Sequence, residues 1–297
     1  MLNKFINKWN DVLVQRRGKI IAFPSLSPLQ SNRIIGAAIA NRRPYLVGRM
    51  GWTEGYTIGQ LLSHGKTPAT LREKLHFHSG VFPPTEKELR FFSDSYLRAA
   101  SAADMLGLLQ FPLEGWLLKK YAPHAATVDL GSLEPYFSEE PWSFHLQGLT
   151  VLVVHPFAAS IQKQYASVRQ ELFANPKVLP EFELKVIQAP QTITDNPKEY
   201  ASWTETLKSL EQKITRESFD VAIIGCGAYG LPLGAFVKSI GKIGIHLGGA
   251  AQLLFGIAGT RWLNNPQFKH LITPAWCRPL LEEQPLGWEK NENGCYW

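Results

Sequence analysis

The sequence predicts an α/β fold, in which an open, mostly parallel Rossmann-like sheet carries helices on both faces. From residue 149 to residue 255, short apolar runs alternate with helical segments, a pattern typical of parallel strands joined by right-handed crossovers. Two of these runs end directly in glycine-rich turns. The chain has 297 residues, enough to bury a substantial core.

We expect one α/β domain over residues 1–297, because no stretch has the composition of a linker. Within it, residues 1–30 are an N-terminal helix and turn, and residues 31–148 form a first half. Residues 149–259 form the Rossmann-like half. The tail over residues 260–297 is rich in Trp, Pro, Glu and Gly, and we expect it to wrap over the domain or close an active site.

The N-terminal segment has apolar residues at helical spacing, at Phe5, Trp9 and Val12, between basic residues. This predicts an amphipathic helix over residues 1–20. The helix either docks its apolar stripe on the body of the protein or lies on an anionic membrane surface. A Ser/Pro-rich turn over residues 25–29 and a helix over residues 32–41 follow.

The run from Tyr45 to Met50 predicts a strand that ends in the sequence GRMGWTEG. Arg49, Gly51 and Glu54 then lie between a strand and a helix, where open α/β folds hold their ligands. Arg49 offers planar donors for phosphate or carboxylate, and Glu54 can hold a sugar hydroxyl, a metal or a proton. The alternative is an Arg–Glu pair that only fixes the turn.

The rest of the first half predicts a loop over residues 77–84, a helix over residues 85–103, a strand over residues 105–109 and a helix over residues 113–121. Thr85 caps the first of these helices, with Glu88 in capping-box position. His76 and His78 lack neighbouring metal ligands at suitable spacing, which argues against a metal there. Asp129 and Glu134 flank a turn, and either could act as a general base.

The second half predicts strands and helices in strict alternation: strands 149–154, 183–187, 221–224 and 243–247, and helices 160–173, 202–214, 231–239 and 250–255. The first strand delivers His155 at its carboxyl end. There a histidine can donate to a phosphate or act as acid or base, or it can be purely structural.

The third strand leads into a glycine-rich turn, and the fourth into a second one. The spacing allows a tight turn and lets an anionic group approach backbone N–H donors, which favours a nucleotide site. The alternative is close packing of a helix on a strand. The residues assigned to this site are Gly225, Cys226, Gly227, Tyr229, Gly230, His246, Gly248 and Gly249.

A dinucleotide cofactor is disfavoured by the absence of an acidic residue about 20 positions after the first turn. His246 occupies that region, and the sequence has no Asp or Glu between Asp220 and Glu282.

The net charge of +6, from 31 basic and 25 acidic residues, favours small anionic ligands or an anionic membrane surface and not nucleic acid. Cys226, Cys277 and Cys295 show no CxxC spacing, so we expect a reduced, cytoplasmic protein, with residues 1–20 as a candidate peripheral membrane contact.

Two stretches, VGRMGWTEG and DVAIIGCGAYGLPLGAFVKSIGKIGIHLGG, resemble bacterial GT-D-fold glycosyltransferases in motif, order and separation, over about residues 43–262. The resemblance implies transfer of a sugar from a nucleotide-sugar donor to a hydroxyl of a glycan, lipid-linked or protein acceptor, in surface glycan or polysaccharide biosynthesis. It implies that Arg49 and Glu54 face the donor and that the glycines at 225, 227 and 230 line the nucleotide pocket. It also implies Mg²⁺ or Mn²⁺ at an acidic DxE motif.

The sequence departs from that motif at Trp52, which stands in place of the first acid and leaves Glu54 alone. Either Glu54 and a diphosphate hold the metal together, or the site is metal-free and Arg49, His155 or Arg278 neutralises the diphosphate. A glycosyltransferase-like enzyme is therefore the leading hypothesis. The alternatives are an NAD(P)-dependent oxidoreductase and a non-catalytic partner that binds nucleotide-sugars or carbohydrate.

Overall fold

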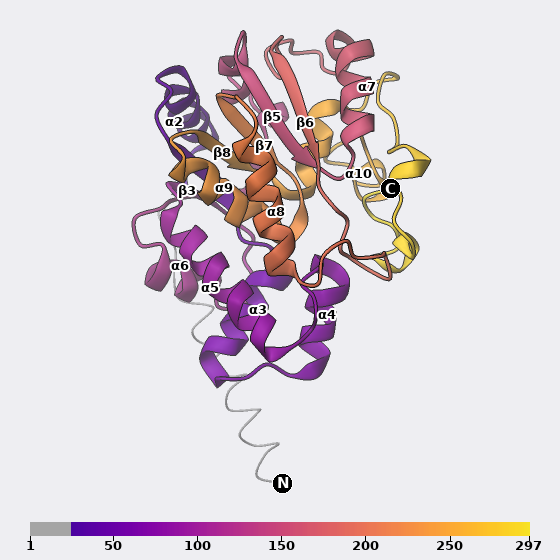
Figure 1. Ribbon diagram of the computed structural model, residues 1–297. Coiled ribbons are helices and arrows are strands. Elements are labelled where there is room, and N and C mark those ends of the chain that lie inside the picture. The colour runs from indigo at the N-terminus through magenta and orange to yellow at the C-terminus, as the bar shows by residue number, and fades with distance from the viewer. Residues whose placement is uncertain (1–24) are drawn as a thin grey trace.

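The computed structural model describes residues 25–297, so the predicted helix over residues 1–20 lies outside the described residues. One sheet of eight strands runs through the molecule in the order β1-β4-β3-β2-β8-β7-β5-β6, and all its pairings are parallel (Figure 1). The α/β class and the parallel, Rossmann-like sheet predicted from the sequence are confirmed.

The strands come from both halves of the chain, and the strand from the first motif, β2, pairs with β8 of the second half. All four residues of β7 are buried because helices cover both of its faces, which explains why its sequence is continuously apolar. The strands are β1 (Ser25–Leu26), β2 (Tyr45–Arg49), β3 (Met105–Leu108), β4 (Ala126–Asp129), β5 (Thr150–His155), β6 (Glu183–Gln188), β7 (Val221–Ile224) and β8 (Ile243–His246).

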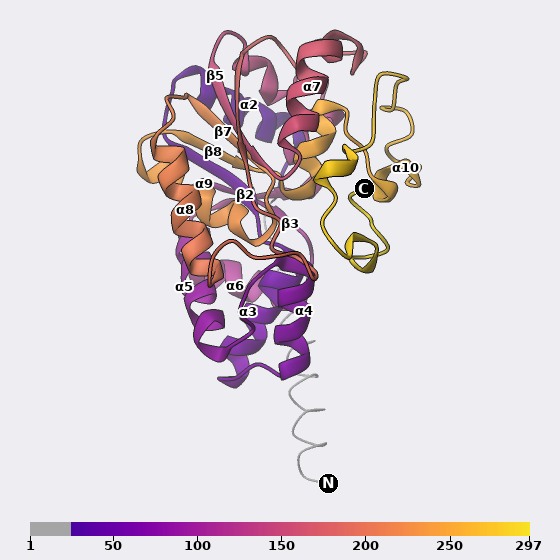
Figure 2. The ribbon, with the colours of Figure 1, turned by 45° about the vertical axis from the view of Figure 1, so that its right-hand side comes forward.

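Helices lie on both faces of the sheet, as Figures 1 and 2 show. The helices are α2 (Pro28–Ala40), α3 (Trp52–His64), α4 (Ala69–Ser79), α5 (Glu86–Ala102), α6 (Glu114–Tyr121), α7 (Ala158–Val168), α8 (Trp203–Thr215), α9 (Gly230–Ser239) and the short α10 (Thr260–Leu263).

In strands β2, β3, β5 and β7, alternate residues belong to two separate cores. In β5, Leu152 and Val154 join the core under α3, α5, α6, α8 and α9, whereas Val151 and Val153 join the core under α2 and α7. The crossover after β5 therefore leaves on one face of the sheet and the crossover after β7 on the other.

Several predicted elements differ from the structure. The predicted loop 77–84 is helical up to Ser79, and α4 ends there because Gly80 takes a left-handed conformation (φ +75°). Strand β4 was not predicted, and the predicted turn at residues 25–29 contains strand β1, which pairs with β4. The predicted helix 250–255 is a 3₁₀ helix, η6 (Gly248–Phe255).

Thr85 caps α5 as predicted, and its hydroxyl oxygen accepts from the Glu88 N–H at 3.2 Å. The Glu88 carboxylate does not complete a capping box. It accepts instead from the backbone N–H and the hydroxyl of Thr204, at 2.8 and 2.5 Å, and so joins α5 to the first turn of α8.

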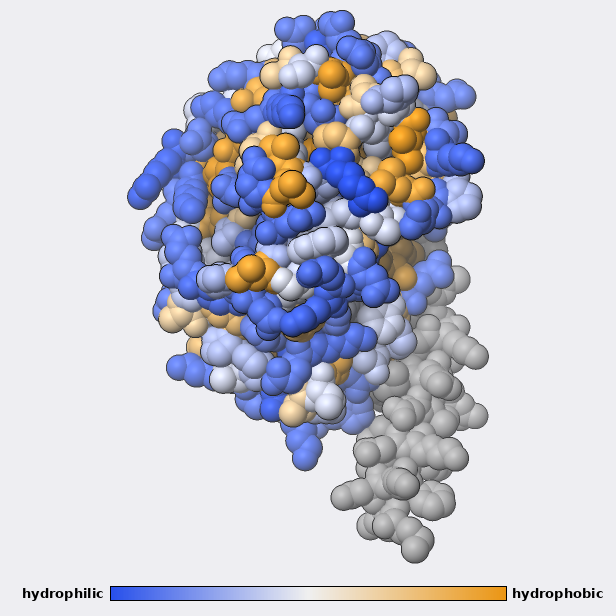
Figure 3. Space-filling model, turned by 90° about the vertical axis from the view of Figure 1, so that its right-hand side faces the viewer, coloured by the Kyte–Doolittle hydropathy of each residue, from blue (hydrophilic) through white to orange (hydrophobic). Residues whose placement is uncertain are grey.

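The tail over residues 260–297 lies beside the sheet in Figure 2, where it is coloured yellow at its end. It is anchored by backbone hydrogen bonds from Ala258 to Cys277 and from Cys277 to Gly256, each 2.9 Å long, and by the buried Trp297 ring. Figure 3 shows the face that carries α7 and this tail, on which apolar residues form separate patches among hydrophilic ones. Within residues 25–297, no helix combines the length and the apolarity that a membrane span requires.

Candidate functional site

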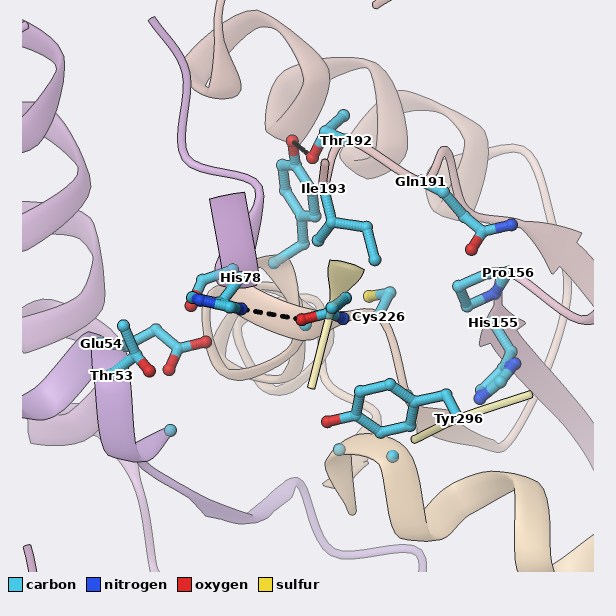
Figure 4. Close-up of a pocket in the computed structure, with 18 of the residues that line it drawn as sticks. Thr53, Glu54, His78, His155, Pro156, Gln191, Thr192, Ile193, Cys226 and Tyr296 are labelled. Carbon is cyan, nitrogen blue, oxygen red and sulfur yellow. Dashed lines mark hydrogen bonds between the residues drawn. The ribbon is translucent and has the colours of Figure 1, made fainter. Parts of the chain in front are cut away.

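The candidate site is a cavity of about 300 Å³ at the carboxyl edge of the sheet. Strands β5 and β7 are neighbours, and their crossovers leave on opposite faces, which is the arrangement that opens a ligand crevice in α/β folds. The ends of β2, β5, β7 and β8 line the cavity, together with residues 190–193, the end of α4 and part of the tail. Figure 4 shows the cavity between Glu54 on one side and His155 and Tyr296 on the other.

Arg49, the last residue of β2, lines this cavity and is partly exposed. Its Nε donates to the Leu247 carbonyl at 3.3 Å. Within residues 25–297, no carboxylate lies close enough to its guanidinium to form an ion pair. The Arg49–Glu54 pair considered from the sequence is therefore not a direct ion pair, and the guanidinium keeps donors for an anionic ligand.

The Arg49 guanidinium can lie against the backbone of residue 248 because this residue is a glycine. A Cβ atom at this position would come within 2.0 Å of Arg49 Nη2, and the backbone has φ +61°. Two things therefore require a glycine in the second turn: the Arg49 side chain, which needs the space, and the left-handed backbone conformation.

Glu54 is the third residue of α3 and only 8% exposed. Burial raises the pKa of its carboxyl, and the nearby Glu292 adds to the rise. Its own N–H, the Arg49 charge and the Ser79 side chain act in the opposite direction. The carboxyl folds back over the first turn of α3, where a Cβ at Gly51 would meet Oε2 at 2.0 Å. Glu54 is therefore a buried carboxyl with raised basicity in a cavity wall.

His155 and His246 are both buried at strand ends and both line the cavity. His155 Nδ1 accepts from the Phe157 N–H at 3.0 Å, and burial lowers the pKa of the ring to about 3. The ring is therefore neutral at pH 7, with its proton on Nε2, and can donate a hydrogen bond. Burial likewise lowers the pKa of His246 to about 3, and its Nδ1 donates to the Ile224 carbonyl at 3.2 Å.

Two glycines of the first turn are required by close packing against histidine rings. A Cβ at Gly225 would lie 2.6 Å from His155 Cδ2, and a Cβ at Gly230 would lie 2.1 Å from His246 Cε1. Gly227 has φ +57°, so it makes the turn itself. The glycine spacing thus admits the two histidines, and Gly225 and Gly227 also line the cavity.

The other two residues assigned to this turn are buried. The Tyr229 ring stacks on Trp203 at 5.5 Å, and its hydroxyl bonds to Thr192 Oγ1 at 2.9 Å, so it holds the loop after β6 against the sheet edge. Burial raises the pKa of the Cys226 thiol, which is therefore not a reactive thiolate.

The tail supplies Arg261, whose residue type suggested a diphosphate contact, and further cavity residues that the sequence did not reveal: Asn291, Glu292 and Tyr296. Asn291 Oδ1 accepts from His78 Nδ1 at 2.9 Å, which joins the tail to the end of α4 (Figure 4). Arg261 pairs with Glu292 and lies 4.6 Å from the centroid of the Tyr296 ring. These residues lie 200 or more positions from Glu54 in sequence, and no local pattern connects them to it.

Of the two remaining residues assigned to the site from the sequence, Gly249 lines the cavity and Arg278 does not. A Cβ at Gly249 would lie 2.3 Å from the Tyr296 ring, so this cavity-lining glycine admits the tail. Arg278 is not among the cavity-lining residues. Its Nη1 donates to the Trp297 carbonyl at 2.5 Å and to Thr260 Oγ1 at 3.0 Å, so it anchors the tail.

The N-terminus of α7 already has an anionic partner. The buried Glu283 carboxylate accepts from the Ala159 and Ser160 N–H groups, at 2.8 and 3.3 Å, and from the Ser160 hydroxyl. This helix end, which follows β5, is therefore filled by the tail and does not offer its N–H groups to a ligand.

A divalent cation would not find a complete protein cage here, because no cluster of three or more His, Cys, Asp or Glu side chains that could hold a metal occurs within residues 25–297. Two carboxyl groups line the cavity, those of Glu54 and Glu292, and Glu292 is paired with Arg261. The residues present fit a metal only if a ligand phosphate completes its coordination, since Mg²⁺ often keeps waters and substrate phosphates.

Comparison of the chain with protein-family models, with curated proteins and with solved structures found no match.

Proposed function

We propose that the protein is a glycosyltransferase that transfers a sugar from a nucleoside-diphosphate sugar to a hydroxyl acceptor in surface glycan or polysaccharide biosynthesis. The observation that carries the proposal is that one cavity holds the cation Arg49, which has no ion-pair partner within residues 25–297, and the buried carboxyl of Glu54. Both come from the GRMGWTEG motif at the end of β2.

Arg49 supports binding of the diphosphate, because a guanidinium pairs with phosphate oxygens through two parallel hydrogen bonds. The neutral His155 ring adds an Nε2–H donor on the far side of the cavity. Among the described residues, no carboxylate is in direct contact with either group. The cavity, about 300 Å³, lies at the small end for ligand sites, so part of a nucleotide-sugar would extend into its open mouth.

Glu54 is suited to act as the general base that takes the proton of the acceptor hydroxyl. The acceptor oxygen attacks the anomeric carbon, and the bond from that carbon to the diphosphate oxygen breaks. The electron pair leaves on the nucleoside diphosphate, where Arg49 stabilises the developing charge. The acceptor proton passes to the Glu54 carboxylate, whose raised pKa makes it a stronger base than an exposed glutamate. A Mg²⁺ or Mn²⁺ ion held by Glu54 and the diphosphate would neutralise the same charge.

An NAD(P)-dependent oxidoreductase has weaker support. The end of β8, where a ribose-binding carboxylate would lie, carries His246, and its ring is buried against Gly230 and bonded to the Ile224 carbonyl. A non-catalytic partner that binds nucleotide-sugars would use the same Arg49 but would not need the basicity of Glu54.

The proposed setting is the cytoplasm, where nucleotide-sugars would be the donors and a glycan, lipid-linked or protein hydroxyl the acceptor. The three cysteines support a reducing compartment, since all are free. A peripheral membrane contact through residues 1–20 would bring a lipid-linked acceptor to the site.

The proposal is tested by thermal shift and transfer assays with UDP-, GDP-, CMP- and dTDP-sugars, with and without Mg²⁺ or Mn²⁺. A donor at about 100 times its Kd should add about 2.7 kcal/mol to the free energy of unfolding. Arg49→Ala should abolish this shift, and Glu54→Gln should abolish transfer while the donor still binds.

The exposed ion pair Arg33–Glu140 supplies the matched controls Arg33→Ala and Glu140→Gln, which should behave as wild type. Absence of a shift with every nucleotide-sugar would refute the proposal. So would full transfer activity in the Glu54→Gln variant. A shift with reduced nicotinamide cofactor alone would favour the oxidoreductase.

A further inference from the structure

Trp52, the first residue of α3, exposes its indole at the rim of the cavity. The side chain lines the cavity and is 43% exposed. Within residues 25–297, the other large hydrophobic side chains that are exposed lie outside the cavity lining. An aromatic ring of this size at the entrance of the cavity leaves an apolar surface in contact with water, which a ligand could cover.

Two neighbouring side chains pack against the Trp52 indole. The Tyr56 ring, one helical turn along α3, stacks on it with centroids 5.3 Å apart and an interplanar angle of 28°. Lys74 of α4 places its ammonium 5.9 Å from the indole centroid. The Trp52 indole, called the platform below, thus has the Tyr56 ring packed against it and the cationic Lys74 ammonium over its ring.

Polar groups surround the platform on the cavity side. Thr53 and the His78–Asn291 hydrogen bond line the same cavity, and Glu54 follows Trp52 by two positions on the first turn of α3 (Figure 4). A flat apolar surface with a polar rim matches a pyranose ring, which presents C–H groups on its faces and hydroxyls around its edge. A lipid chain would need a continuous apolar surface, whereas Thr53 and Glu54, which follow Trp52 in the chain and line the same cavity, are polar.

We infer that Trp52 forms the acceptor subsite and stacks against a pyranose ring of a saccharide acceptor, so that a ring hydroxyl faces Glu54. This inference rests on the proposed function. A donor bound at Arg49 would extend into the mouth of the cavity, and an acceptor that stacks on Trp52 would meet it there, because the indole lines the cavity and is exposed.

The test is saturation-transfer difference NMR of the full chain with a panel of methyl glycosides and short oligosaccharides, recorded with and without UDP or GDP. Wild type should bind at least one saccharide, with saturation concentrated on the C–H protons of one ring face. Trp52→Ala should weaken this binding about tenfold or more, since an aromatic stacking contact contributes on that scale. Trp52→Phe should keep most of it.

Phe91 provides the matched control. It is 47% exposed, and the Lys87 ammonium lies 5.9 Å from its ring centroid, as Lys74 does at Trp52, yet it does not line the cavity. Phe91→Ala should leave saccharide binding unchanged. Equal loss in both variants would make the effect a non-specific one and overturn the inference.

A nucleotide-sugar thermal shift on the same samples separates the two proposals. If donors bind but no saccharide does, or if Trp52→Ala binds saccharides as wild type does, the acceptor subsite is refuted and the proposed function stands. If saccharide binding depends on Trp52 but no nucleotide-sugar binds, the transferase proposal fails and Trp52 belongs to a carbohydrate-binding protein.

Discussion

Arg49 shows how much of the site depends on residues that carry no chemistry themselves. Its guanidinium is held between the Leu247 carbonyl and the backbone of Gly248, and the approach is close enough that any side chain at position 248 would displace it. The glycine is therefore as necessary to ligand binding as the arginine, although it offers no side-chain contact to a ligand.

Gly248→Ala tests this dependence. The substitution should cost about 1 kcal/mol of stability, because the left-handed backbone disfavours a Cβ. It should also abolish the nucleotide-sugar thermal shift, because the new Cβ would overlap the Arg49 guanidinium. Gly241→Ala is the matched control, with φ +81° and open space around its Cβ position, so it should carry the backbone cost alone. Equal donor shifts in the two variants would contradict the role assigned to Gly248.

The sequence identified Arg49 and Glu54 as site residues because strand-end position and residue type are local properties. It could not supply their environment. The low pKa of His155 comes from burial, and the need for Gly230 comes from the ring of His246, which lies 16 positions away at the end of β8. Both effects depend on contacts between elements that only the folded chain brings together.

At the scale of elements, the loop between β3 and α6 connects a cavity residue to a buried carboxyl. Glu114 accepts from the Leu109 and Gln110 N–H groups, at 3.1 and 2.6 Å, and Leu109 lines the cavity. The same loop inserts Phe111 against Gly55 of α3, where a Cβ would lie 2.1 Å from the ring. Glu114 thus holds the loop that supports the helix carrying Glu54.

Glu114 should make the stability of the protein depend on pH. Burial raises the pKa of its carboxyl from about 4.5 to about 7. Between these values the folded state binds the proton that the unfolded state has lost, so this contribution to stability falls as the pH rises through about 7. Glu114→Gln, which resembles the protonated acid, should flatten the profile.

The measurement is urea unfolding at pH 5 and pH 8. Wild type should lose more stability than Glu114→Gln over this interval, and the exposed Glu289→Gln should follow wild type. Identical pH profiles for wild type and Glu114→Gln would exclude this role for the carboxyl.

At the scale of the whole molecule, the cavity is enclosed by parts of the chain that are remote in sequence. The alternation of strands and helices predicted a parallel sheet, and most strands were placed within one or two residues of their observed bounds. The strand order was beyond sequence reasoning, since it places β2 beside β8, and so was the path of the tail, which depends on single long-range contacts. Arg278 is the clearest case. Its residue type suggested a contact with phosphate, but in the folded chain it bonds to Thr260 and to the Trp297 carbonyl.

Arg278→Ala distinguishes these two roles. In the structure its guanidinium bonds to the Trp297 carbonyl and to Thr260, so its loss should loosen the segment that carries Tyr296 into the cavity. Hydrogen exchange at the backbone amides of residues 291–297 should rise about tenfold or more, because a hydrogen bond from a charged donor contributes about 1.5–3 kcal/mol. Exposed Arg33→Ala should leave this exchange unchanged. If Arg278 instead acted as a phosphate contact, its replacement would weaken donor binding while exchange in the tail of the ligand-free protein stayed at the wild-type rate.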